Sequence, residues 1–239
     1  MARKRFSARR SPGAQRARQA RPAPAPKKSQ PTETPAPTPQ HRLRVGVIPG
    51  ATPGKWVDTW QQRFSRAPLE LVEVAARDAV QAVREGTVDI AIARLDREAS
   101  GSPDDLHVIR LYTELAVVVA HRDSFLLAAN ELALADLEGQ GLLPLNDEVI
   151  AAADLRHPEW IDTAPLTPEE AIATVAAGVG ATVVPMSLAR LHQRGDVGYR
   201  PLTDGPPLPV GLVWRRDHEP VEVTAFIGVV RGRTSNSSR

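Results

Sequence analysis

Cysteine is absent from this sequence of 239 residues. Its absence excludes disulfide bonds, thiolate metal ligands and a cysteine nucleophile. No apolar run approaches the roughly 18–20 residues that a membrane-spanning helix needs, and no apolar stretch of a secretory signal follows the basic start. We therefore expect a cytoplasmic protein. The Arg-rich, acid-poor start also has the composition of an organelle transit peptide, and that alternative stays open.

Patterns that would support catalysis or cofactor binding are missing as well. The run Gly178–Gly180 follows a predicted helix rather than a strand, the wrong order for a dinucleotide-binding turn, and no Gly-rich phosphate loop with a lysine occurs. Ser187 lacks the flanking glycines of a nucleophile elbow. We predict no enzyme activity, no cofactor and no metal site. The histidines show no metal-ligand spacing; they are His41, His107, His121, His157, His192 and His218.

The formal net charge of +2 conceals an asymmetry along the chain. Residues 1–42 hold eleven lysines and arginines against a single acid, Glu33, whereas the rest of the chain holds 19 basic and 27 acidic residues. The high isoelectric point therefore arises from the N-terminal segment. An acidic remainder argues against a nucleic-acid-binding groove on the folded part.

The basic segment, residues 1–41, is predicted to be a disordered tail. Beyond Met1 and Phe6 it has no large apolar side chain, so folding could not bury enough surface to offset its conformational entropy. Residues 21–40 alternate proline with small residues, which favours an extended, polyproline-like chain. A second basic, polar tail is expected at residues 231–239. Cations of the first tail could contact nucleic acid weakly and without sequence specificity, or stay solvated without a role; the candidates are Arg3, Lys4, Arg5, Arg9, Arg10, Arg16, Arg18 and Arg21.

From residue 43 onward, short β-branched runs alternate with helical patterns. Trp56, Trp60 and Phe64 recur every four residues and mark the first helix. Alternating strands and helices at this spacing predict a mostly parallel α/β sheet. The predicted strands of this half are 43–49, 69–75, 88–95, 106–112 and 114–121, with a second helix from residue 79 to Gly86.

The second half of the chain continues the alternation. Residues 167–178 form the clearest predicted helix, because Thr167 can cap it, Pro168 suits the first helical position and Glu170 completes a capping box. The other predicted elements are short helices at 133–139 and 187–195, strands at 141–145, 181–185, 197–202 and 209–216, and a last helix near 220–230.

The stretch TVAAGVGATVVPMSLARL resembles a segment of LysR-type effector-binding domains, in which a helix, Ala-Ala-Gly, x-Gly, a strand, Val-Pro and Ser follow one another. Further pieces occur in the family's order, and together they cover residues 42–230. They are the opening strand LRVGVIPG (43–50), the helix–Gly–x–x–Asp–strand–Arg unit AVREGTVDIAIARL (82–95), the crossing strand ELAVVVAHRDSFL (114–126), the first stretch itself (174–191) and the returning pair (197–217).

The resemblance implies an α/β fold of the periplasmic-binding-protein-like (type 2) class, preceded by the disordered basic tail. In that class, two α/β subdomains are joined by two crossover strands. Subdomain I would comprise residues 42–120 and 205–230, and subdomain II residues 121–204. The crossovers would then fall near 120–122 and 202–205. A ligand cleft would lie between the subdomains, where strand ends and helix N-termini meet.

Two features depart from the family pattern. The family normally begins with a winged helix-turn-helix and a long dimerising helix, and the basic tail occupies that region here, which puts sequence-specific DNA reading in doubt. The segment between Leu145 and Thr167 also looks shorter than usual, so a helix of subdomain II is expected to be missing or reduced. Within that segment, His157, Trp160 and Asp162 are interpreted as part of an irregular surface loop rather than as a polar site.

The candidate ligand-binding residues are those that the family and the strand ends would place at the cleft. Arg94 ends a buried strand and could clamp a carboxylate with two hydrogen bonds, or it could form a salt bridge with a nearby acid. Thr52 could bind a ligand or only cap the first helix. Asn146 could donate to a ligand or lie in a plain turn, and the helix start at Thr167 could face the cleft or solvent. The full set is Gly50, Thr52, Pro53, Arg94, Leu143, Pro144, Asn146 and Thr167.

The predicted function is a transcription-related regulatory module. A small, anionic metabolite would bind in the cleft and shift the population between two subdomain arrangements, and the partner would be a second copy or another regulator. Three alternatives stay open: a solute receptor of a transport system, an enzyme on a related scaffold, and a degenerate domain that binds no ligand and acts through its tail. The missing signal peptide and the cationic tail oppose the first, and no catalytic set supports the second.

Overall fold

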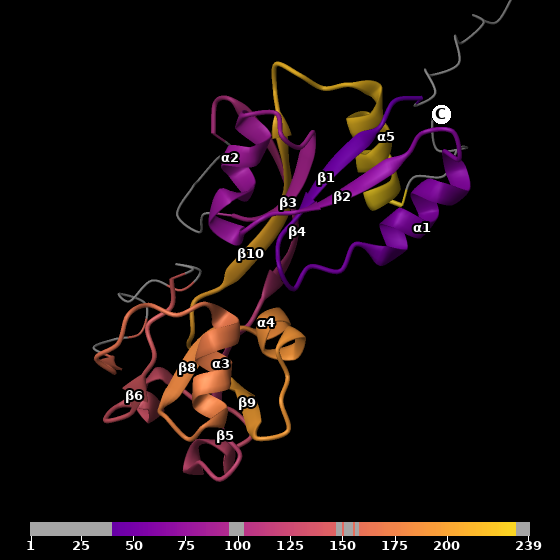
Figure 1. Cartoon of the computed structure of the whole chain (residues 1–239). Helices are drawn as coiled ribbons and strands as arrows, with labels where there is room; N and C mark the ends of the chain where they lie inside the picture. Colours follow the sequence, from indigo (N-terminus) through magenta and orange to yellow (C-terminus); the bar gives the residue numbers. More distant parts are fainter. Residues whose placement is uncertain (1–39, 96–102, 147–149, 151–154, 156–157, 233–239) are drawn as a thin grey trace, which may run out of the picture. The chain divides into compact units, whose positions relative to one another are not determined.

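The described chain contains two β-sheets. This computed structural model describes residues 40–95, 103–146, 150, 155 and 158–232, and all of them belong to one compact unit. Sheet 1 consists of β1 (Leu43–Val47), β2 (Leu69–Glu73), β3 (Ile90–Arg94), β4 (Leu106–Glu114) and β10 (Leu208–Arg215). Sheet 2 consists of β5 (Ala116–His121), β6 (Gly141–Leu142), β7 (Glu159–Trp160), β8 (Ala181–Pro185) and β9 (Val197–Pro201) (Figure 1).

The pairing within both sheets is mixed. Sheet 1 has the order β2-β1-β3-β10-β4, in which β1 is parallel to β2 and β3, and β10 is antiparallel to β3 and β4. Sheet 2 has the order β7-β6-β8-β5-β9, in which β5 is antiparallel to both neighbours. The prediction of mostly parallel sheets is therefore wrong. β4 leads the chain toward sheet 2 and β10 brings it back, so these two strands run in opposite directions and pair without a crossover helix. The alternation of elements along the chain does not reveal this.

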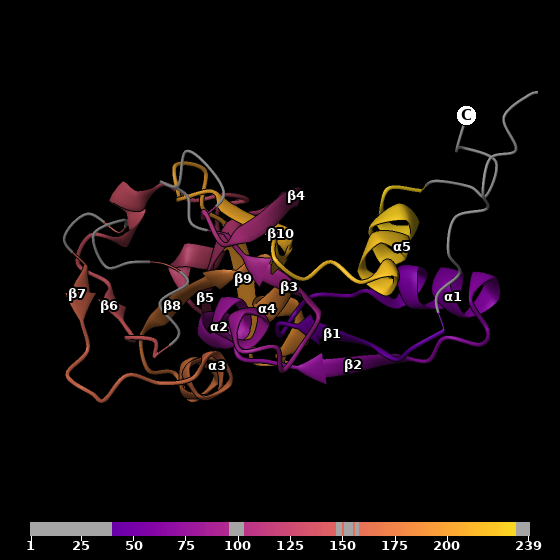
Figure 2. The same cartoon turned by 90° about the horizontal axis from the view of Figure 1, so that it is seen from above.

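Helices cover sheet 1 on both sides. α2 (Ala79–Arg84) packs against β3 and β10 on one side. On the other side α1 (Gly54–Arg63) and α5 (Val221–Val230) lie side by side, as both views show (Figures 1 and 2). Between the layers β3 is buried over its whole apolar length, as the unbroken run of apolar residues in its sequence predicts for a strand covered on both faces.

The aromatic repeat of α1 faces α5. Trp60 is fully buried, and its ring centroid lies 4.7 Å from that of Phe64 and 6.0 Å from that of Phe226 on α5. The Trp60 indole N–H donates a hydrogen bond of 2.8 Å to the carbonyl oxygen of Ala67. The side chain therefore fills the layer between helix and sheet without leaving its polar atom unpaired, which is how buried tryptophans are normally accommodated.

Sheet 2 is covered differently on its two faces. α3 (Pro168–Ala176) and α4 (Met186–Leu191) pack against β5 and β8. Val117 and Val119 of β5 face these helices, because successive side chains of a strand point to opposite faces. The alternate residues of β5 face the opposite core; they are Ala116, Val118 and Ala120. That opposite face is covered by short 3₁₀ helices at Phe125–Leu127 and Leu134–Leu137.

Several predicted elements differ in detail from the structure. The short helix expected at 133–139 is a 3₁₀ turn. The strand expected at 141–145 is a regular strand only at its first two residues, β6, and its last residue, Leu145, forms an isolated bridge with Leu166. The segment expected to be irregular contains β7, and part of it, including His157, lies outside the described residues. The capping box of α3 is confirmed: the Glu170 N–H donates to Thr167 Oγ1 at 3.2 Å, and the Thr167 N–H donates to the Glu170 carboxylate at 2.8 Å.

The chain passes from sheet 1 to sheet 2 at a single residue, Leu115. Glu114 ends β4 in sheet 1 and Ala116 begins β5 in sheet 2. We had expected this crossing near residues 120–122, but β5 pairs along its length with strands of sheet 2 only. The position of the crossing cannot be predicted from the sequence, because the residues on both sides of Leu115 are equally suited to a strand. The return crossing lies in residues 202–207, between β9 and β10.

Candidate functional site

A cavity of about 340 Å³ lies between strand ends of sheet 1 and two helices of sheet 2. Its sheet 1 side contains Pro49, just after β1, then Glu73 at the end of β2, and residues 75–77 beyond it. Its sheet 2 side contains Asn146, the start of α3 and the end of α4. The carboxyl ends of strands and helix N-termini are where open α/β sheets bind ligands. The volume falls within the range of roughly 300–1,000 Å³ that is typical of small-molecule sites.

The lining of this cavity combines charges of both signs with apolar surface. Arg77 and His192 contribute basic groups, while Glu73 and Glu169 contribute carboxylates. The Arg77 Nε atom lies 3.8 Å from an oxygen of Asp78, and both side chains are 64% exposed. An exposed pair at this distance is weak, so the Arg77 guanidinium can still engage a ligand. The apolar part of the wall is formed by Ala75, Ala76, Leu188 and Leu191.

Thr167 lies at the cavity, but its hydroxyl is already engaged. It donates to the Glu170 carboxylate at 2.8 Å and accepts from the Glu170 N–H. Backbone and side-chain hydrogen bonds from Thr167 lower the pKa of Glu170, so the capping carboxylate remains ionised at neutral pH. The contribution of Thr167 to the cavity is therefore to hold the start of α3 in place.

A family model described as the LysR substrate binding domain matches residues 36–235. The chain belongs to the LysR substrate-binding domain family. The resemblance inferred from the stretch at 174–191 is thereby confirmed.

Two curated relatives of this LysR domain are transcriptional regulators from Cupriavidus pinatubonensis (strain JMP 134 / LMG 1197), TfdS and TdfR. Each is 29% identical to the chain over 176 residues. The match covers 71% of this chain and 59% of each relative, so the LysR domain described here spans about three fifths of the length of these regulators.

Solved structures share the fold at low identity. The effector binding domain of BenM with its effector benzoate has a TM-score of 0.67 at 21% identity, covering 82% of this chain and 96% of that one. The oxidised form of OxyR has a TM-score of 0.64 at 22% identity, covering 85% and 100%. Full-length CbnR in complex with its target DNA has a TM-score of 0.63 at 19% identity, covering 81% and 68%. These similarities confirm the expected periplasmic-binding-protein-like fold of the LysR domain.

Arg94, the expected carboxylate clamp, is not among the residues that line the cavity. Its Nη1 atom donates to the Glu114 carboxylate at 2.6 Å, and the side chains of the two residues are only 11% and 9% exposed. Of the two interpretations of Arg94, the structure shows the salt bridge. Burial and the neighbouring charge of Glu114 raise the pKa of Tyr112, with Arg94 acting in the opposite direction, so the Tyr112 hydroxyl stays protonated beside this pair.

The remaining predicted residues take different places in this LysR domain. Asn146 lines the cavity, and its N–H donates to the Leu166 carbonyl, so it lies in an ordered connection as well as at the cavity. Leu143 is 2% exposed and packs in the core beside α3 and α4, which leaves it no surface for a ligand. Thr52 is exposed and makes no side-chain cap for α1, whose N-cap residue is Pro53.

Sequence reasoning missed most of the charged lining. Glu73 could have been found, because it lies close to the end of the strand predicted at 69–75, at the same sheet edge as Pro49, and the strand-end rule applies to both. Arg77 follows four residues later in the same connection. Leu191 and His192 carry no comparable signal. Leu191 ends the short helix α4 and His192 follows it, and the orientation of this helix depends on the packing of sheet 2.

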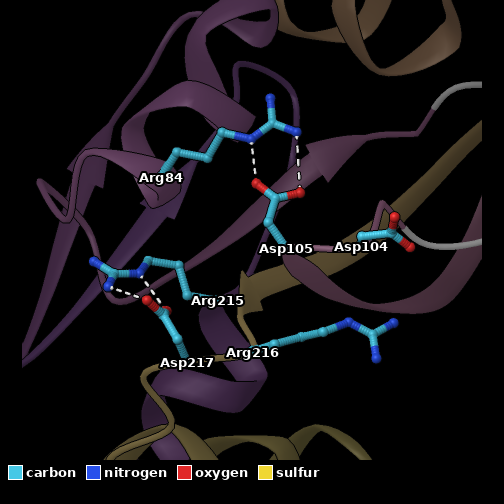
Figure 3. A pocket seen from close by; sticks show the side chains of 6 residues that line it. All are labelled: Arg84, Asp104, Asp105, Arg215, Arg216 and Asp217. Carbon is cyan, nitrogen blue, oxygen red and sulfur yellow. Dashed lines mark hydrogen bonds and ion pairs between the residues drawn. The ribbon is translucent and has the colours of Figure 1, made fainter.

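A second hollow, of about 430 Å³, lies at the ends of α2, β4 and β10 (Figure 3). Two of its arginines are engaged by its own aspartates: Arg84 Nε lies 2.7 Å from Asp105 and Arg215 Nε lies 2.8 Å from Asp217. The third, Arg216, donates from Nε to the backbone carbonyl of Leu106 at 2.8 Å. The hydrogen bond from Arg84 lowers the pKa of Asp105, and the one from Arg215 lowers the pKa of Asp217. An anionic ligand would have to displace these carboxylates, so we regard the cavity between the sheets as the candidate site.

Proposed function

We propose that this LysR domain is an effector-binding regulatory module whose ligand occupies the cavity between the two sheets. The observation that carries the proposal is that the cavity is two-sided: strand ends of sheet 1 form one wall, and helices of sheet 2 form the other. A ligand in such a site contacts both sides at once, and it therefore binds best to one particular separation of the two walls. Differential contact of this kind is what a ligand needs in order to shift a conformational equilibrium.

The proposed ligand is a small metabolite with an anionic group and at least one hydrogen-bond donor. Arg77, His192 and the Asn146 amide can face the anionic group, as the initial prediction of an anionic metabolite requires. Glu73 and Glu169 line the same cavity, and a purely anionic ligand would leave these carboxylates opposed by like charge. A hydroxyl or ammonium group on the ligand would satisfy them.

The proposed context is transcription regulation in the cytoplasm. It is supported by the family and by the regulators TfdS and TdfR; among the described residues, no helix is long and apolar enough to cross a membrane. In this proposal the domain performs no chemistry, and it acts with a second copy or with another regulator. Salt-sensitive, sequence-independent contact of Arg3, Lys4, Arg5 and the other tail cations with nucleic acid stays part of the proposal.

Ligand binding can be tested by thermal unfolding of the full chain. The panel should contain aromatic and aliphatic carboxylic acids, each with and without a hydroxyl or amino substituent. A ligand at about 100 times its dissociation constant stabilises the native state by about 2.7 kcal/mol, which for a chain of this size raises the melting temperature on the order of 5 °C.

The matched variants separate the site from general charge effects. Arg77→Gln should abolish most of the ligand-induced shift, whereas Arg66→Gln, an exposed arginine outside the cavity lining, should leave it unchanged. The absence of any shift across the whole panel, or an equal shift in both variants, would contradict the assignment of this cavity.

A further inference from the structure

Gly50 and Ser187 lie too close together for a side chain at position 50. Gly50 follows β1 and has a φ of +86°, and Ser187 lies in the first turn of α4. A Cβ atom placed on Gly50 would lie 2.5 Å from Ser187 Oγ and 2.8 Å from Ser187 Cβ. Both neighbours in sequence, Pro49 and Leu188, line the cavity. The contact therefore lies at the edge of the candidate site, where the two walls meet.

The Ser187 hydroxyl makes this contact without a hydrogen bond. Its Oγ atom is buried and has no partner among the described residues. A buried hydroxyl without a partner is unfavourable, since it has lost its water and gained nothing in return. If the two walls separated, water could reach Oγ again. The contact is thus a steric limit on approach rather than a bond that holds the walls together.

The contact also lies close to the crossing between the sheets. The Met186 N–H donates to the carbonyl of Leu115 at 3.0 Å, and Leu115 is the residue at which the chain leaves sheet 1. The start of α4 is therefore fixed to the crossing point, one residue before Ser187. A small change in spacing near the crossing produces a larger change farther out along α4, where Leu191 and His192 line the cavity.

We propose that Gly50 and Ser187 are positioning residues that set the smallest separation of the cavity walls. Only glycine at position 50 permits the present approach, because any side chain there would meet Ser187. The inference rests on the proposed function in one respect, that the cavity between the sheets is the ligand site. Its structural part, the limit on wall separation, holds whether or not a ligand is known.

The wall separation can be measured without a ligand by electron–electron double resonance between two spin labels. The chain has no cysteine, so two introduced cysteines can carry the labels. Gln62→Cys on α1 and Glu138→Cys, just after the 3₁₀ helix Leu134–Leu137, place one label on each side of the cavity. Both positions are exposed. Gly50→Ala should lengthen the mean distance. Adding Ser187→Gly, which removes both the Oγ and the Cβ atoms from the contact, should restore the original distance.

Gly178→Ala provides the matched control. Gly178 has the same φ of +86°, but a Cβ there would meet nothing within 4 Å, so this variant carries the backbone strain without the contact. An unchanged distance in Gly50→Ala, the same lengthening in Gly178→Ala, or no restoration in the double variant would overturn the proposal. Ser187→Val places a larger side chain against Gly50 and should also lengthen the distance between the labels. This variant tests the proposal if Gly50→Ala does not fold.

The same variants, measured with a ligand, distinguish a failure of the steric limit from a failure of the ligand site. With a ligand from the thermal panel, Gly50→Ala should weaken apparent affinity about tenfold, because the binding-competent separation becomes a minor state, and the double variant should restore it. A lengthened distance with unchanged affinity would contradict the ligand site but not the steric limit. An unchanged distance with a ligand shift that depends on Arg77 would contradict the limit but not the site.

Discussion

Arg94 and Glu114 form a buried ion pair that spans β10. Arg94 on β3 stands opposite Val210, and Glu114 on β4 stands opposite Leu208, so the bond of 2.6 Å between their side chains bridges the strand that lies between them. The pair joins β4, which leads to sheet 2, with β3, which lies on the other side of β10. β10 is the strand that returns from sheet 2. It therefore ties together the end of sheet 1 that faces the crossing.

Removing one partner of this pair should be costly. Glu114→Gln leaves the Arg94 guanidinium buried without a counter-charge, and such changes typically cost about 3–5 kcal/mol. Replacing both residues, as Arg94→Met with Glu114→Leu, should recover most of that loss because no charge then remains buried. Urea denaturation of Arg94→Met, of Glu114→Leu and of the double variant measures the coupling. Additive losses would show that the pair contributes no coupling energy.

Thr182 is expected to tolerate loss of its hydroxyl. The residue is fully buried in β8, and its Oγ1 atom has no hydrogen-bond partner among the described residues. Thr182→Val keeps the shape and removes the unpaired group, so the free energy of unfolding should stay equal or rise by up to about 1 kcal/mol. The matched control is Val183→Thr on the next position of β8, which should cost about 1–3 kcal/mol. A clear loss of stability in Thr182→Val would mean that the hydroxyl has a partner after all.

Glu222 should make stability depend on pH in the acid range. Its carboxylate is 4% exposed and accepts the N–H groups of Gln40 and His41 at 3.2 and 3.0 Å. Burial alone would raise the pKa of Glu222. Hydrogen bonds from the backbone N–H groups of His41, Glu222 itself and Gln40 outweigh burial, and the pKa of Glu222 lies below its usual value.

Because the folded-state pKa of Glu222 lies below the unfolded one, its contribution is fully present above the unfolded pKa of about 4.3 and is lost as pH falls through the folded value. Urea denaturation at pH 7 and near pH 3 should therefore show a smaller difference in Glu222→Gln than in the unchanged chain. Glu138→Gln, an exposed residue, should keep the full difference. An identical pH dependence in both variants would rule out this role for Glu222.

Trp60 should be the most sensitive of the tryptophans tested. Trp60→Leu removes a fully buried ring that contacts both Phe64 and Phe226, together with the hydrogen bond to Ala67, and should cost about 3 kcal/mol or more. Trp160→Leu on β7, where the ring is 42% exposed, should cost well under half of that. Thermal unfolding followed by circular dichroism gives the comparison. Similar losses in both variants would mean that the packing of α1 on α5 contributes little.

Elements whose signals are local could be predicted from the residues alone. The four-residue aromatic repeat of α1, the capping box at Thr167 and the unbroken apolar run of β3 each report on residues that are neighbours along the chain, so pattern alone was sufficient to predict them. Family membership was equally accessible, because the stretch at 174–191 combines a helix end, two glycines and a buried strand in one short segment.

How these elements pair, and which side chains meet, could not be predicted in this way. The antiparallel pairing of β10, the crossing at Leu115 and the bond between Arg94 and Glu114 join residues that are far apart in the chain, and many pairings are compatible with the same local pattern. Arg94 illustrates the difference: the strand end predicted a charge at the cleft, but whether that charge meets a ligand or an acid depends on the strands placed beside it. The contact between Gly50 and Ser187 has the same origin, since it exists only where the two sheets approach each other.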